Sequence, residues 1–106
     1  MSNDFPVWNQ SFADELKGAV VLVGLTHNER DGSRLEQFFG KVIAIDEHDG
    51  VTLQLQGSRA GKDYHLPPHL DAFFPAPPGT YRLRGTGEEV VDPNFTTTWE
   101  INPPEA

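Results

Sequence analysis

Apolar and polar residues alternate most regularly in residues 51–56. Val51, Leu53 and Leu55 fall on one side of an extended chain, and polar residues occupy the positions between them. Successive side chains of a β-strand point to opposite faces, so this pattern predicts a strand with one buried face. The apolar segment 35–46 and the acidic turn 47–50 precede it. Together these segments predict a β-hairpin from Gln37 to Gln56.

The first strand of this hairpin is predicted to bend. Simple alternation places Phe38, Val42 and Ala44 on one face and the intervening residues on the other. Gly40 interrupts the apolar run, and a glycine inside a strand is typical of a bulge or a sharp bend. A sheet bent in this way curls over its core, which favours a barrel.

The rest of the chain predicts short elements joined by frequent turns, because it contains 10 Gly and 9 Pro. Ser11 is the expected N-cap of a short helix that ends at Gly18. Further strands are expected at residues 19–25, 62–66, 80–84 and 96–101, a helical turn at 69–73, a polar loop at 27–34 and a turn-rich excursion at 85–94. The predicted fold is all-β: one domain over residues 1–106, a small, partly open barrel of five to six strands with a short N-terminal helix. Residues 1–10 are expected to form a flexible arm and residues 102–106 a tail.

Charge and cysteine content narrow the classes of partner. The formal net charge is −8 and the sequence pI is about 4.7, which favours basic partners and disfavours the phosphate backbone of nucleic acid. The absence of cysteine excludes disulfides and thiolate chemistry and suits the cytoplasm. No apolar run is long enough to span a bilayer, and the first residues lack the pattern of a signal peptide. We therefore expect a cytoplasmic protein without a membrane partner.

The order of short helix, strand, bent strand, tight turn and alternating strand resembles the Sm-like fold. The first Sm motif pairs a G-x-V-x-x-x-D strand with a V-x-L strand, and its positions match Gly40, Val42, Asp46, Val51 and Leu53. The resemblance covers residues 11–56 and implies a small barrel that binds nucleic acid. Leu83-Arg84-Gly85 is similar to the second motif, although a proline-rich insertion of some 25 residues precedes it. Gly50 follows Asp49 where the family places an RNA-reading Asn, so RNA binding is disfavoured.

Two groups of residues are candidates for binding a partner. Phe73 and Phe74 are adjacent in a proline-rich segment, so one ring is expected in the core and the other is free for contact. Arg82 and Arg84, with Arg59 and Lys62, form the main concentration of positive charge. Beside aromatic residues these arginines suit stacking on nucleotides; in the plainer interpretation they pair with Glu88, Glu89 and Glu100.

The histidines offer weaker candidates. His27 and His48 lie in acidic loops that suit acid–base or cation chemistry, but such loops are typically solvated turns. His65 and His69 have the spacing of metal ligands on a helix, which Pro67-Pro68 prevents. We therefore expect no catalytic residue, metal or cofactor. The leading hypothesis is an acidic protein-interaction module without catalysis; the alternatives are an Sm-like nucleic-acid-binding protein and a small metal-dependent or acid–base enzyme.

Overall fold

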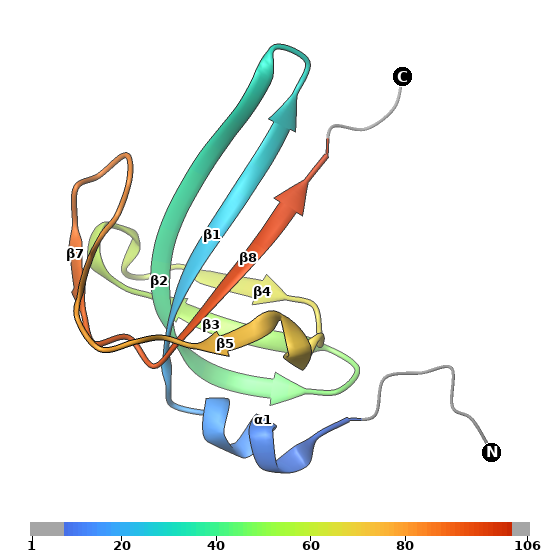
Figure 1. Ribbon diagram of the computed structural model, residues 1–106. Helices are drawn as coiled ribbons and strands as arrows, with labels where there is room; N and C mark the ends of the chain where they lie inside the picture. The colour runs from blue at the N-terminus through green and yellow to red at the C-terminus, as the bar shows by residue number, and fades with distance from the viewer. Residues whose placement is uncertain (1–7, 103–106) are drawn as a thin grey trace.

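The computed structural model describes residues 8–102 and confirms a mostly β fold with one short N-terminal helix (Figure 1). One sheet has six strands in the order β4-β3-β2-β1-β8-β5, and a second sheet pairs β6 with β7. Their bounds are β1 Val20–Glu29, β2 Gly32–Asp46, β3 Gly50–Leu55, β4 Asp63–Leu66, β5 Phe73–Pro75, β6 Thr80–Arg82, β7 Glu89–Val91 and β8 Phe95–Ile101. Within the described residues the large sheet is curled and does not close into a barrel.

Helix α1, Gln10–Leu16, covers one end of the curled sheet (Figure 1). Its N-cap is Asn9 and not Ser11: the Asn9 side chain accepts a hydrogen bond from the backbone N–H of Phe12. Either residue type can cap a helix, so composition alone could not choose between them. Ala13 and Leu16 are fully buried, and Gly18 adopts a left-handed conformation after the last turn. Two short 3₁₀ turns, η1 Gly57–Arg59 and η2 Leu70–Ala72, complete the helical structure described.

Strand β2 bends because its two ends pair with different strands. Its first part pairs with β1 and its second part with β3. The β-bulge lies between Val42 and Ala44, beyond Gly40, so alternation shifts there and Ala44 is exposed while Ile45 packs against the core. The prediction that Ala44 shares the face of Val42 is therefore wrong. Gly40 serves a different purpose: a Cβ at this position would lie 2.8 Å from the Gln54 carbonyl oxygen.

Two apolar clusters lie on opposite faces of the sheet. The main core fills the concave side and includes Val51, Leu53 and Leu55, as predicted, together with Val21 and Val23. A smaller cluster on the convex side contains Leu22, Leu83 and Val90 beneath the β6–β7 pair, with partial cover from Val20, Phe39 and Tyr81. Glu88 attaches this pair to η1 by accepting hydrogen bonds from the Ser58 backbone and hydroxyl, at 2.9 and 2.8 Å.

The predicted polar loop at residues 27–34 is instead the outer end of a long β-hairpin. Strands β1 and β2 pair without interruption as far as Glu29 and Gly32, leaving only Arg30 and Asp31 between them. Both faces of this end are largely exposed, so polar side chains suit it and the apolar alternation that marks a half-buried strand is missing. An Arg34–Glu29 ion pair at 3.1 Å joins the two strands.

In the described part of the chain, no helix is long and apolar enough to cross a membrane.

Candidate functional site

The curled sheet is open along one line, which we call the seam: the gap between β4 and residues Thr98–Ile101 of β8. Strand β4 pairs with β3 on one side only. Strand β8 pairs with β1 over its whole length, but β5 covers only Phe95–Thr97 on its other side. The seam is therefore bordered by two strand edges that no described strand covers. A sheet edge of this kind is available for pairing with another chain.

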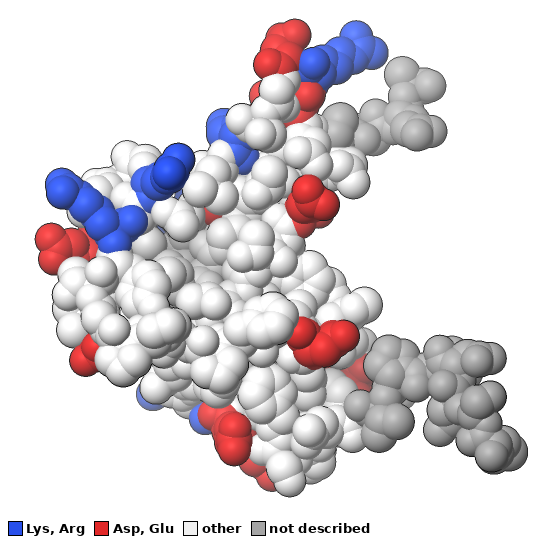
Figure 2. All heavy atoms as spheres, in the orientation of Figure 1, with Lys and Arg blue, Asp and Glu red and all other residues white. Residues whose placement is uncertain are grey.

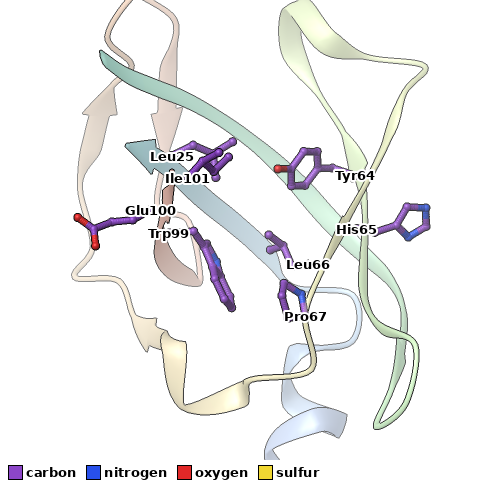
Figure 3. Close-up of a pocket in the computed structure, with 8 residues that line it drawn as sticks. All are labelled: Leu25, Tyr64, His65, Leu66, Pro67, Trp99, Glu100 and Ile101. Carbon is purple, nitrogen blue, oxygen red and sulfur yellow. The ribbon is translucent and has the colours of Figure 1, made fainter. Parts of the chain in front are cut away.

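A pocket of about 210 Å³ lies in the seam and is open to solvent. Its inward-facing side chains are apolar or aromatic and come from β1, β4 and the segment after it, and β8: Leu25, Tyr64, Leu66, Pro67, Trp99 and Ile101 (Figure 3). His65 and Glu100 also border the pocket, but their side chains point away from it. Strand register explains this difference: Trp99 and Ile101 pair with Leu25 and His27, whereas Glu100 pairs with Thr26 on the opposite face.

Trp99, which lines the pocket, carries a polar group in an unusual environment. Its indole Nε1 is buried and has no hydrogen-bond partner among the described residues. A buried donor without an acceptor costs about 1–3 kcal/mol, so such groups are rare in folded proteins. The imidazole of His69 packs against the indole with ring centroids 6.0 Å apart and nearly perpendicular planes.

A charged cluster shares the concave face with the pocket. Glu36 lies opposite Leu25, which in turn lies beside Trp99. The Glu36 carboxylate contacts His27 Nε2 at 2.8 Å and accepts a hydrogen bond from Arg59 at 2.5 Å. The Arg59 guanidinium also stacks 4.6 Å from the centre of the Phe38 ring, which packs edge-on against Tyr64. This cluster holds η1 and the wall of the seam against β2.

The pairing of Glu36 predicts a pH dependence of stability. The hydrogen bond from His27 lowers the pKa of Glu36 below its ordinary value. The hydrogen bond and the positive charge of Arg59 lower this pKa further. A carboxylate with a lowered pKa stabilises the fold above its unfolded-state pKa, and this contribution disappears as pH falls through the folded-state pKa. We expect Glu36→Gln to lower the free energy of unfolding by up to about 1 kcal/mol at pH 7, with the difference from wild type shrinking below pH 4.5.

Urea denaturation of both proteins at several pH values between 3 and 7 measures this difference. The pKa values of Asp46 and Glu88 are also lowered, through backbone N–H donors of the turn 47–50 and through Ser58 respectively. Both groups are present in both proteins, so the comparison isolates Glu36. A difference that stayed constant down to pH 3 would contradict the assigned role.

The structure separates the two predicted phenylalanines. Phe73 is 3% exposed and belongs to the main core, whereas Phe74 is 60% exposed. The prediction that one ring is buried and the other free is confirmed. A partner contact by Phe74 stays a prediction, since this ring lies on β5 and does not line the pocket.

Arg82 and Arg84 are exposed, and neither forms an ion pair in the part of the chain that the structure describes. Arg82 lies opposite Glu89 across the β6–β7 pair. The expected pairing with Glu88 is not formed because Glu88 binds Ser58, and Glu100 lies on β8 at the seam. Arg59 is occupied by Glu36. The two arginines therefore remain candidates for binding a partner, away from the seam.

The histidines do not converge. His65 contacts the Thr52 hydroxyl at 3.1 Å on the outer face, while His69 packs on Trp99. Among residues 8–102, no group of three or more His, Asp or Glu side chains is placed to hold a metal ion. Among the described residues the His27–Glu36 pair most resembles an acid–base dyad. Sequence reasoning missed it because His27 was expected in a polar loop, whereas the pairing of β1 with β2 brings it diagonally across from Glu36. Its carboxylate is shared with Arg59, and no hydroxyl hydrogen-bonds His27 within the described residues.

No family model, curated protein or solved structure matches this chain. The resemblance to the Sm-like fold therefore stays a prediction, and function must be argued from the seam.

Proposed function

We propose that this protein is an interaction module, without catalysis of its own, whose partner occupies the seam between β4 and β8. The observation that carries the proposal is the apolar pocket between two uncovered strand edges. Monomeric proteins tend to cover strand edges and to bury apolar surface, so a site that exposes both suits a contact with another protein.

The charge of the molecule indicates the kind of partner. The formal net charge of the chain is −8. Figure 2 shows a hollow in the surface, with acidic side chains on both sides of it and mostly uncharged walls. Glu100, which borders the pocket, and Asp63, which precedes Tyr64 on β4, are exposed carboxylates. An apolar centre with an acidic rim favours a basic protein, because the rim speeds and orients association while the centre supplies affinity. The same charges disfavour nucleic acid.

A photo-crosslinking amino acid placed at Ile101 tests this function. Ile101 lines the pocket and is 39% exposed, so a change there is compatible with folding. Irradiation in lysate of the source cells is expected to give a discrete adduct with a basic protein. With that partner purified, Ile101→Lys is expected to weaken binding at least tenfold, the usual effect of losing an apolar anchor. Binding of the wild type is also expected to weaken as salt rises.

Val91→Lys is the matched control, because Val91 is an apolar strand residue that is 66% exposed and lies on β7, away from the pocket. Its affinity is expected to stay within twofold of the wild type. Adducts formed equally from positions 91 and 101, an acidic partner, or the absence of any adduct at position 101 would each reject the proposed function.

A further inference from the structure

The uncovered edge of β8 has a defined length and orientation. Strand β5 pairs with Phe95, Thr96 and Thr97, and the chain just before β5 forms the η2 turn. Among the described residues, the next four of β8, Thr98–Ile101, pair with β1 alone. An edge of four residues directly continues the line of β5, so an added strand would extend a pairing that the sheet already contains.

The backbone groups on this edge can be assigned from the β5 pairing. Pro75 has no N–H and lies opposite Phe95, and the Ala76 N–H donates to the Asn94 carbonyl. In an antiparallel pair, hydrogen-bonded and non-hydrogen-bonded positions alternate, so the hydrogen-bonded position falls on Thr96. By the same alternation, Thr98 and Glu100 direct backbone groups toward the seam.

The pocket then sets what one side chain of an added strand must be. A cavity of about 150 Å³ lined by apolar side chains holds a benzene molecule, and the pocket here measures about 210 Å³. It therefore has room for one aromatic or large aliphatic side chain. The surrounding residues offer that side chain apolar contacts from Leu25, Leu66, Trp99 and Ile101.

The opposite face of the seam carries one exposed carboxylate on each strand. Glu100 points away from the pocket in Figure 3, and Asp63 occupies the equivalent outward position on β4, opposite Gln54. In an added strand, side chains that alternate with the apolar anchor would face this acidic side. Lysine or arginine at those positions would meet opposite charge, whereas acidic residues would be repelled.

We propose that the partner binds as an extended segment that adds to the free edge of β8 at Thr98–Ile101. The segment places one large apolar side chain in the pocket and basic side chains at alternate positions. This inference rests on the proposed function and specifies the chemistry and conformation of the partner. Recognition would combine main-chain hydrogen bonds with one side-chain pocket, as in other cases of strand addition.

A phage-displayed library of random 12-residue peptides is the probe, with the full-length protein as target. Selected peptides are expected to show one aromatic or large aliphatic residue flanked by Lys or Arg at every second position. In synthetic copies of a selected peptide, N-methylation of the amides that face β8 is expected to weaken binding at least tenfold. N-methylation of the intervening amides is expected to have less than a threefold effect.

Hydrogen exchange supplies a readout that depends on backbone pairing alone. On peptide binding, the amides of Thr98 or Glu100 are expected to gain at least tenfold protection. Those of Arg82 and Val91, on the separate β6–β7 sheet, serve as controls and are expected to stay unchanged. Ile101→Lys should prevent both binding and protection.

The outcomes separate this inference from the function on which it rests. Peptides that bind without protecting Thr98 or Glu100, or that tolerate N-methylation at every position, would reject strand addition while leaving the interaction module intact. So would a failure to select any peptide when crosslinking from position 101 yields a protein partner. Protection that rises with protein concentration and without peptide would identify a second copy of this chain as the occupant, and would also reject the proposal.

Discussion

Replacing Gly50 by alanine is expected to lower the free energy of unfolding by about 3 kcal/mol. Gly50 begins β3 with φ +92, a conformation that side chains other than glycine rarely adopt, which accounts for about 1 kcal/mol or more. An added Cβ would also lie well inside contact distance of the Leu66 carbonyl oxygen. Because this neighbour is backbone of β4, relief requires the two strands to move apart, at a cost of about 1–3 kcal/mol. Urea denaturation at pH 7 measures the loss.

Gly61→Ala is the matched control for this substitution. Gly61 has nearly the same φ, +95, but an added Cβ there would meet no atom within 4 Å. It should therefore show the backbone cost alone, about 1 kcal/mol. The difference between the two variants then measures the close approach of β3 and β4. Equal losses would show that the contact with Leu66 does not matter.

Sequence reasoning succeeded where local pattern and tertiary burial agree. Val51, Leu53 and Leu55 alternate because β3 has the core on one face only, and the pattern reports this directly. The sequence did not predict strands at the exposed end of the β1–β2 hairpin for the same reason. A strand whose two faces are both exposed to solvent shows no alternation of apolar and polar residues. Gly40 predicts a bulge or a sharp bend, because glycine is a usual marker of both. The bulge lies farther along the strand, between Val42 and Ala44, and the glycine is required by the close approach of Gln54.

The seam was beyond reach of the sequence for a different reason. Its two walls come from Tyr64 and Trp99, which are far apart in the chain and meet only because β8 runs parallel to β1. Tyr64, Trp99 and Leu25 each look like ordinary core residues when taken singly. That one ring of Phe73 and Phe74 is exposed was predicted from a local signal, two adjacent aromatics in a proline-rich segment. A pocket that depends on a strand order has no such local signal.

Leu53→Ala is expected to lower the free energy of unfolding by about 2–5 kcal/mol, because it leaves a cavity at the centre of the main core. Leu53 is fully buried and pairs with Val42 on β2 and Tyr64 on β4. Leu35→Ala is the matched control: Leu35 also lies on a strand but is 38% exposed, so its loss should stay below about 1 kcal/mol. Urea denaturation compares the two, and similar losses would contradict the assignment of the core.

The same variant separates stability from recognition. Leu53 pairs with Tyr64 of β4 and does not line the pocket. Measured well below the unfolding transition, Leu53→Ala should therefore weaken partner binding less than Ile101→Lys, although it destabilises the fold more. The reverse order would mean that the pocket residues act mainly by holding the sheet together. If both orders hold as expected, the seam is a surface that the fold exposes without needing it for its own stability, as a binding site for another chain requires.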